Sequence, residues 1–286
     1  MIIKKFNIKW LNNCNYTNYT SLSIWKNYLL ANRMNSNAIE IFDNTNGKYS
    51  NDILDKDIGI FEIKNADDIL IINDILFRVD YFLGVCQVYN LKSNDVISVF
   101  IFKNLKLLKS LYEYDDNKYI LYGLDNIDNN ILRYEIEIID DNIKNIKKNR
   151  LISLPKVNIS NVIIDFNFDR ILINDKIKSK LYVLSLEGNI LNVMNIEISN
   201  IIIHNNFYIY TDNEKDTNMI HLINRDNLNY KMSYYSEKIK NITYMESVNE
   251  DIYILDNDCS LAKIFFENNN NLLFFILGVI ISGIFK

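Results

Sequence analysis

Ile252-Tyr-Ile-Leu255, a short polar turn and Ser260-Leu-Ala-Lys-Ile-Phe265 follow one another late in the chain, and this unit decides the fold. Both runs consist mainly of β-branched, aromatic and other apolar residues, which is typical of β-strands. The same order of apolar run, polar turn and apolar run recurs through the chain. The earlier copies are Asn27–Ala31 with Ala38–Asp43, Asp74–Val79 with Val85–Tyr89, Lys118–Tyr122 with Ile131–Ile136, Arg170–Asn174 with Lys180–Leu184, and Phe207–Tyr210 with Met219–Ile223.

The copies repeat roughly every 40–45 residues, and with about four strands per repeat this is typical of propeller blades. We therefore expect an all-β fold, a β-propeller of WD-like repeats with six or seven blades. The seventh blade would lie in Ile58–Tyr89, and a β-sandwich with a small appendage is the alternative fold. The remaining strands are expected at Val96–Phe102, Val162–Phe168 and Ile196–Ile203, and Leu105–Tyr114 is either a strand or a short helix.

The N-terminal run Ile2–Trp10 has no partner within its own repeat. A strand left alone at a sheet edge exposes unpaired backbone groups. We expect this run to pair with the last blade and so to close the ring.

The chain divides into residues 1–267, the propeller, and residues 268–286, a tail. Leu272–Phe285 carries no charge, and as a helix it would span roughly 21 Å, against about 30 Å for a bilayer core. We expect a C-terminal transmembrane helix that anchors the propeller; docking of the tail on the propeller or on a partner is the alternative. The residues expected in the membrane are Leu272, Phe274, Phe275, Ile276, Leu277, Val279, Ile280, Ile281, Ile284 and Phe285.

The charge and composition exclude some classes of protein. A net charge of −5 and a pI of about 5.2 argue against nucleic acid as a partner, because such proteins usually present a basic face. The chain has only 7 Gly and 1 Pro, so Asn is expected to form the turns, since it tolerates the left-handed conformation. Cys14, Cys86 and Cys259 are widely spaced and odd in number, which favours a reducing compartment.

No pattern for covalent catalysis or metal binding is present. His204 and His221 each lie in an apolar, strand-like run without a second ligand at metal spacing, so both are expected to be structural. No phosphate-binding or nucleophile motif occurs. We expect no catalytic residue, no metal site and no small-molecule substrate.

A basic cluster follows Asp140-Asp141 and is expected in a loop as a solvated surface. If the tail is anchored, this cluster is a candidate contact for anionic lipid or an acidic partner. Its members are Lys144, Lys147, Lys148, Arg150 and Lys156.

A propeller whose last repeat runs directly into an apolar tail resembles one family, the endoplasmic reticulum exchange factors for the Sar-family GTPase, which start COPII coat assembly. In that family a loop between the second and third strands of the first blade holds a potassium ion and inserts at the GTPase. That loop ends in a Gly-Ile-Pro-Asn-like motif. The equivalent stretch here is Leu29-Leu-Ala-Asn-Arg-Met-Asn-Ser-Asn37, and Asn37 matches the last residue of the motif. The glycine-rich part and the Gly-Ile-Pro part are absent from it.

The resemblance implies a guanine-nucleotide exchange factor at the endoplasmic reticulum membrane, with a single membrane pass and the propeller in the cytosol. The implied partner is a Sar-family small GTPase. Potassium is the one ion that the resemblance suggests. The residues implied to contact the GTPase are Asn32, Arg33, Met34, Asn35 and Asn37.

Two other functions remain open from the sequence. One is a non-catalytic, membrane-anchored WD-like scaffold for protein–protein interaction. The other is a lineage-specific surface protein, which glycosylation sequons would suit. The sequons begin at Asn15, Asn18, Asn158 and Asn241.

Overall fold

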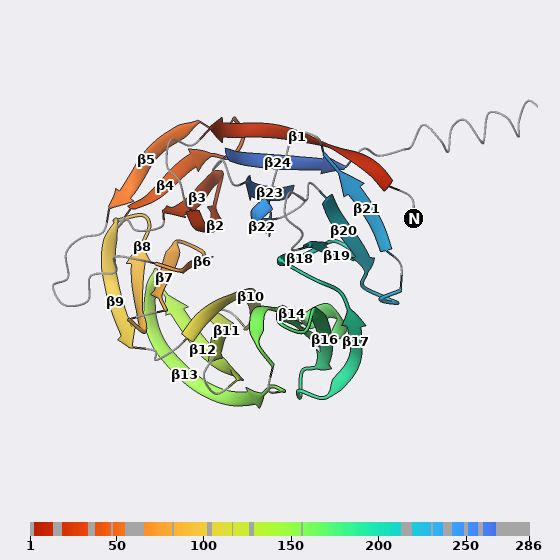
Figure 1. Ribbon diagram of the computed structural model, residues 1–286. Coiled ribbons are helices and arrows are strands. Elements are labelled where there is room, and N and C mark those ends of the chain that lie inside the picture. The colour runs from red at the N-terminus through yellow and green to blue at the C-terminus, as the bar shows by residue number, and fades with distance from the viewer. Residues whose placement is uncertain are drawn as a thin grey trace, which may run out of the picture.

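The computed structural model shows six four-stranded blades arranged in a ring around a central axis (Figure 1). This confirms the expected all-β propeller, with six blades. The structure describes residues 3–13, 19–33, 38–46, 48–54, 66–81, 83–101, 105–115, 117–125, 129–155, 157–212, 219–229, 231–236, 242–248, 251–256 and 260–266.

Within blades 1 to 5, strands that follow one another in sequence pair antiparallel, from the centre of the ring outward. Blade 1 consists of β2 (Tyr19–Trp25), β3 (Tyr28–Arg33), β4 (Ala38–Asp43) and β5 (Tyr49–Leu54). Blade 2 consists of β6 (Asp68–Ile72), β7 (Ile75–Asp80), β8 (Val85–Asn90) and β9 (Asp95–Ile101). Blade 3 consists of β10 (Leu105–Asp115), β11 (Lys118–Asp125), β12 (Asn130–Ile139) and β13 (Asn142–Ser153).

The other half of the ring repeats this order. Blade 4 consists of β14 (Ile159–Asp165), β15 (Arg170–Asp175), β16 (Lys180–Ser185) and β17 (Ile190–Asn195). Blade 5 consists of β18 (Asn200–His204), β19 (Phe207–Thr211), β20 (Met219–Asn224) and β21 (Lys231–Tyr235). Blade 6 consists of β22 (Ile242–Val248), β23 (Asp251–Asp256), β24 (Ser260–Phe266) and β1 (Ile3–Asn13).

The N-terminal strand closes the ring, as the sequence predicts. β1 pairs antiparallel with β24, in a register that runs from Phe6 opposite Phe266 to Asn13 opposite Ser260. Its first residues also pair in parallel with the outer strand of blade 5, with Ile3 opposite Ser233. β1 therefore covers the outer edges of two adjacent blades, and Figure 1 shows it along both.

The hydrophobic core is distributed over the junctions between blades. Each junction holds one cluster of buried side chains drawn from the two adjoining blades. Alternation along a strand sends neighbouring residues to opposite junctions. In β15, Ile171 and Ile173 face blade 3, whereas Leu172 faces blade 5. Strands buried on both sides therefore read as continuous apolar runs.

Asparagine forms many of the tight turns, as its tolerance of positive φ predicts. Asn73, Asn117 and Asn205 lie in the turns between first and second strands, with φ of 54°, 64° and 50°. Asn90 and Asn224 begin turns between third and fourth strands, where their side-chain oxygens accept backbone N–H groups two and three residues later. Asn thus replaces Gly and Pro as the turn-forming residue.

Some expected boundaries differ from the structure. β6–β9 form one blade over Asp68–Ile101, so the described part of Ile58–Tyr89 contains no seventh blade. Leu105–Tyr114 is a strand. The strand expected at Val162–Phe168 ends at Asp165, because Phe166–Phe168 turns into a 3-10 helix that the Asp165 side chain caps. The strand expected at Ile196–Ile203 begins at Asn200.

The basic cluster was predicted in a loop, and this is wrong for the lysines that the structure describes. Lys144, Lys147, Lys148 and Arg150 lie on β13, whose ladder with β12 shifts register twice, once at Lys144. The side chains of the three lysines are exposed because β13 is the outermost strand of its blade. The described residues include no helix long and apolar enough to cross a membrane, and residues 268–286, the predicted anchor, lie outside them.

Candidate interaction surface

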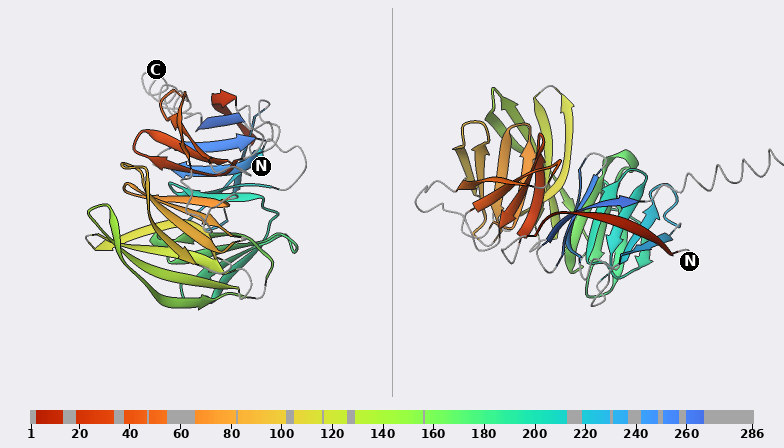
Figure 2. Two further views of the ribbon diagram at one scale, coloured as in Figure 1. Left: turned by 90° about the vertical axis from the view of Figure 1, so that its left-hand side faces the viewer. Right: turned by 90° about the horizontal axis from the view of Figure 1, so that it is seen from above.

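The antiparallel blades divide the turns between two faces of the ring. Turns between second and third strands and the connections between blades lie on one face, which we call the connection face. Turns between first and second strands and between third and fourth strands lie on the other, the hairpin face. Figure 2 shows from the side that the strands run across the thickness of the ring between these faces.

The second strands end on the connection face with a regular pattern. In five blades an aspartate stands at this end, and in blade 1 an arginine takes its place. The residues, in blade order, are Arg33, Asp80, Asp125, Asp175, Asp212 and Asp256.

Two of these aspartates show why the residue type recurs. Asp80 Oδ1 accepts the backbone N–H of Leu83 at 2.8 Å, and Asp175 Oδ1 accepts that of Lys178 at 3.2 Å. Each carboxylate therefore fixes the turn that follows it, as Asp commonly does.

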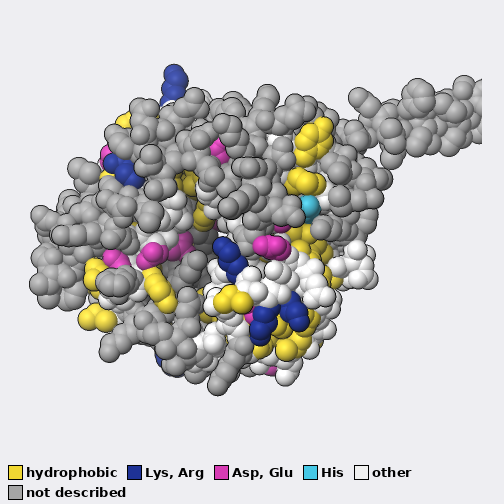
Figure 3. Space-filling view, in the orientation of Figure 1, with side chains coloured by type: hydrophobic (Ala, Val, Ile, Leu, Met, Phe, Trp, Pro, Cys, Tyr) yellow, Lys and Arg dark blue, Asp and Glu magenta, His cyan; other side chains and the backbone are white. Residues whose placement is uncertain are grey.

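The apolar side chains of Leu83 and Ile177 are exposed at these turns. On the face in Figure 3, hydrophobic side chains lie in small separate groups, some beside Lys and Arg over blade 4.

Blade 1 carries a different polar cluster at the equivalent place. Arg33 forms an ion pair with the buried Glu40 of β4 and lies 3.9 Å from Asp52 of β5. Tyr19 of β2 donates its hydroxyl to Glu40. A hydrogen bond to Asp52 raises the pKa of Tyr49. This cluster of opposite charges and tyrosines crosses all four strands of the blade, and Arg33 is partly exposed.

Asn32, the residue before Arg33, fixes the strand end from within. Its side chain is fully buried, and Nδ2 donates to Thr20 Oγ1 at 2.5 Å and to the Ala66 carbonyl at 2.7 Å. Ala66 directly precedes blade 2, so Asn32 fastens one blade to the start of the next. Asn174 of blade 4 donates in the same way to Ser160 and to the carbonyl of Ile198.

The structure therefore describes only part of the predicted GTPase-contacting loop. Asn32 and Arg33 end β3 on the connection face, and only Arg33 of the two reaches the surface. Met34, Asn35 and Asn37 lie outside the described residues, so their contact with a GTPase stays a prediction. The same holds for a potassium ion in this loop and for every predicted membrane residue from Leu272 to Phe285.

His221 takes part in a chain of hydrogen bonds within blade 5. Its Nδ1 lies 2.7 Å from Ser233 Oγ, and its Nε2 lies 3.2 Å from Asp212 Oδ2. Ser, His and Asp in this order form the nucleophilic relay of serine hydrolases. Here Ser233 is 0% exposed, so a substrate cannot reach its hydroxyl. The ring of Tyr210 stacks on the imidazole at 4.9 Å, and the chain ties neighbouring strands together.

His204 is also hydrogen-bonded, with Nδ1 2.9 Å from Ser247 Oγ of blade 6. Both histidines thus have the partners of structural histidines. Within the ranges that the structure describes, no three His, Cys, Asp or Glu side chains are grouped so that they could hold a metal ion.

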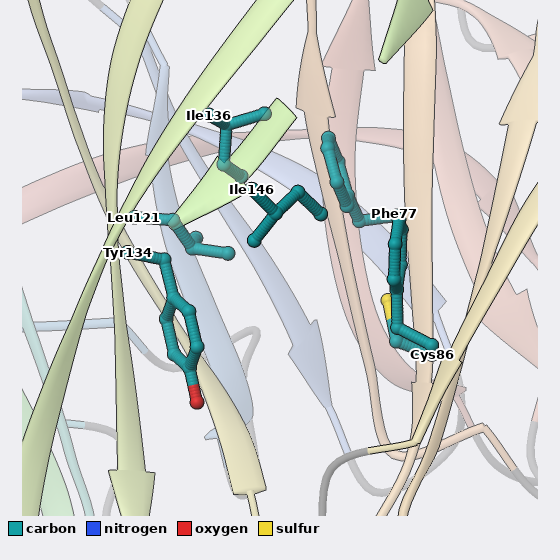
Figure 4. A pocket seen from close by; sticks show the side chains of 7 residues that line it. Phe77, Cys86, Leu121, Tyr134, Ile136 and Ile146 are labelled. Carbon is teal, nitrogen blue, oxygen red and sulfur yellow. The ribbon is translucent and has the colours of Figure 1, made fainter. Parts of the chain in front are cut away.

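Cys86 lines a small apolar cavity between blades 2 and 3 (Figure 4). Phe77 and Cys86 of blade 2 face Leu121, Tyr134 and Ile136 of blade 3 across it. The cavity holds about 10 Å³ and its lining is apolar. Burial raises the pKa of the Cys86 thiol to about 12, so the thiolate that would react is scarce near neutral pH. This place in the core offers no reactive group.

Two charged clusters lie on the hairpin face and join blades. Asp74 accepts the indole N–H of Trp25 at 2.8 Å and pairs with Lys26 and Lys92. Asp165 of blade 4 pairs with Arg225 of blade 5. Every one of these groups already has a partner inside the propeller, which makes them structural contacts.

Sequence reasoning did not find Glu40, Tyr19 and Asp52 as parts of the blade 1 cluster. One signal for Glu40 was available, because it interrupts the apolar run Ala38–Phe42 that is otherwise typical of a strand buried on both sides. A second signal was Arg33 itself, which departs from the aspartate of the other repeats. No spacing rule joins residues of four separate strands, so their convergence needs the fold.

Known structures resemble this chain in fold. BamB from Moraxella catarrhalis matches with a TM-score of 0.53 at 9% identity, over 87% of this chain and 84% of that one. U3-55K matches with a TM-score of 0.61 at 8% identity, over 91% of this chain and 98% of that one. No protein-family model matches, and no curated protein matches in sequence. At such low identity the likeness shows the propeller fold alone.

Proposed function

We propose that this protein is an interaction propeller that binds a protein partner on its connection face, centred on blade 1. The observation that carries the proposal is Arg33, which stands where the other five blades have aspartate. Asp80 and Asp175 close their own turns, whereas Arg33 is held by Glu40 and Asp52 and stays partly exposed. An exposed arginine held in place by carboxylates is well suited to recognition, because its fork of donors is pre-oriented.

Apolar side chains support the same face. Leu83 and Ile177 are exposed at turns of blades 2 and 4. These turns lie on the connection face, where β3 ends at Arg33. A polar anchor surrounded by separate apolar contacts is typical of a surface that binds protein rather than a small ligand.

Site-specific photo-cross-linking tests this assignment. A cross-linking residue at Leu83 or Ile177 should capture a discrete partner in cell extract, and the same residue at Lys26, exposed on the hairpin face, should not. Capture only from Lys26 would place the partner on the other face and refute the proposal.

A second, more specific function is nucleotide exchange on a Sar-family GTPase at the endoplasmic reticulum membrane. The observation that favours it is that blade 1 departs from the repeat pattern at the very turn that the resemblance assigns to GTPase contact. An exchange factor needs no acid–base chemistry. It binds the nucleotide-free GTPase better than the loaded one and so shifts the population towards release.

GDP release separates exchange from simple binding. The full chain should accelerate release of fluorescent GDP from the Sar-family GTPase of the same organism, and Asn37→Ala should reduce the rate about tenfold, or about 1.4 kcal/mol. Asp226→Ala, exposed in the turn between the third and fourth strands of blade 5 on the hairpin face, is the control and should release GDP like the wild type. Binding of the GTPase without acceleration would leave the interaction propeller as the function.

A further inference from the structure

The outer strand of blade 4, β17, has an unusual composition for an exposed edge. Ile190, Leu191 and Val193 are 53%, 57% and 41% exposed. β17 is the last strand of its sheet, and no strand pairs with its outer side in the part of the chain that the structure describes. Apolar side chains on an uncovered edge favour contact with another chain.

Each of the other outer strands contains a charged residue or is covered by another strand. β13 presents the exposed lysines Lys144, Lys147 and Lys148, and β1 covers the edge of β21. β5 contains Asp52 and β9 begins with Asp95, whereas β17 reads Ile-Leu-Asn-Val-Met-Asn and contains no charge. Charged residues on an edge strand discourage pairing between molecules. β17 lacks this protection.

The charges that flank β17 are arranged by sign. Glu187 is exposed in the turn just before it, and Lys176 and Lys178 are exposed in the turn that lies beside its far end. The register places this end there, because Asn195 of β17 lies opposite Lys180 of β16. Lys178 Nζ also lies 3.9 Å from the buried Asp175. The exposed Glu197 follows the same far end, where two exposed lysines outnumber it. One end of the strand is therefore acidic, and the exposed charge at the other is net positive.

We propose that two copies of this protein associate through β17, with the two strands side by side and antiparallel about a twofold axis. This arrangement joins the apolar residues of the two copies at the centre. It also sets Glu187 of each copy near Lys178 of the other, so the flanking charges are complementary only in the antiparallel arrangement. A second copy of this chain is the partner that fits β17, because its apolar residues and flanking charges are complementary to themselves.

The turn before β17 is closely packed, and the ladder between β17 and β16 shifts register at Leu191. Gly188 has φ of 92°, and a Cβ there would lie 2.8 Å from the carbonyl oxygen of Ser153 in blade 3. Backbone hydrogen bonds from Ser185 to Asn189 and from Gly188 to Ser185 close the preceding turn. These contacts fix the backbone at the start of the edge strand. The second copy would approach the connection face only at the turn between β15 and β16 of blade 4. Blade 1, on the opposite side of the ring, stays open to a partner, so the proposal does not rest on the proposed function.

Sedimentation of the full chain at increasing concentration tests the association. The wild type should show a monomer–dimer equilibrium, and Leu191→Lys should raise its Kd at least about tenfold. Ile101→Lys is the matched control, because Ile101 is 67% exposed on the outer strand of blade 2. It should leave the Kd unchanged. The tail is common to all variants, so association driven by the tail would persist in Leu191→Lys and would overturn the proposal.

Charge reversal tests the antiparallel geometry separately. Glu187→Lys and Lys178→Glu should each weaken the dimer, and the double variant should restore it to within about threefold of the wild type. Circular dichroism and thermal unfolding should show that each variant is folded. A wild type that stays monomeric at all concentrations, or a double variant no tighter than the single variants, would refute the proposal.

Discussion

The junction between blades 1 and 2 and the junction between blades 4 and 5 are built on the same plan. On the connection face, Asn32 and Asn174 each donate to a carbonyl that precedes the next blade, both at 2.7 Å. On the hairpin face, an aromatic side chain donates to a carboxylate of the other blade. Trp25 donates to Asp74 at the first junction, and Tyr208 donates to Asp165 at the second.

The two junctions differ in how far their charges are buried. The lysines that pair with Asp74 are more than half exposed. Asp165 and Arg225 are 1% and 7% exposed, and two guanidinium nitrogens of Arg225 reach the same carboxylate. Burial and the hydrogen bond to Asp165 raise the pKa of Tyr208. The same contacts therefore give a solvated ion pair at the junction of blades 1 and 2 and a buried ion pair at the junction of blades 4 and 5. The two junctions should respond differently to mutation, pH and salt.

Removal of the buried carboxylate should have the largest effect. Asp165→Ala leaves Arg225 buried without its counter-charge and should lower the free energy of unfolding by about 3–5 kcal/mol. Asp74→Ala, at the solvated junction, should cost about 1 kcal/mol or less. Urea unfolding of both variants measures the difference. Equal losses would show that the two junctions are energetically alike and that burial does not distinguish them.

The shared clamps should contribute equally. Asn32→Ala and Asn174→Ala each leave a backbone carbonyl without its side-chain donor and should each cost about 1–3 kcal/mol. Asn195→Ala, at an exposed position of β17, is the control and should change stability by less than about 0.5 kcal/mol. A loss at one clamp only would contradict the equivalence of the two junctions.

Acid should weaken the solvated junction. A hydrogen bond from Lys92, with those from Trp25 and Lys26, holds the pKa of Asp74 well below its ordinary value. The folded pKa is therefore lower than that of the unfolded chain, about 3.9. The stabilisation is present above that value and is lost as the pH falls through the folded pKa. The Tm advantage of the wild type over Asp74→Asn should shrink between about pH 5 and pH 2. An advantage that grows on acidification would contradict this sign.

Salt should have the smallest effect and should separate the junctions again. At about 1 M NaCl the Debye length is about 3 Å, so the cost of Asp74→Ala should fall towards zero, a change below about 1 kcal/mol. The cost of Asp165→Ala should remain, since solvent does not reach the pair. Urea titrations at low and high salt measure both. A similar loss of both costs would mean that Asp165 is as accessible to salt as Asp74.

Much of the fold could be predicted from local pattern. β11, β15 and β23 are buried on both sides. Each therefore appears in the sequence as a continuous apolar run, without the alternation of apolar and polar residues that a half-exposed strand shows. The closing strand was predictable because Ile2–Trp10 lacks a partner in its own repeat, and β1 pairs with β24. The strand Val162–Phe168 was extended too far, because Asp165 caps a turn that its apolar neighbours do not reveal.

The candidate surface was less predictable. Arg33 was singled out from the sequence, but its partners Glu40, Asp52 and Tyr19 come from three other strands of the blade. Asn32 was expected in the same loop, and its buried side chain instead fastens blade 2. Neighbouring residues of a strand point to opposite sides, and packing against the start of blade 2 decides that the side of Asn32 is buried.

The amino-acid sequence is enough to predict the repeating blade, the closure of the ring and the use of asparagine in its turns. These features follow from hydrophobic period and backbone preference, which act over a few residues. The packed ring is needed to learn that Asp165 meets Arg225, that Arg33 replaces an aspartate within a ring of equivalent strand ends, and that no described strand covers β17. Those outcomes depend on contacts between blades, where burial and charge are set by residues far apart in the chain.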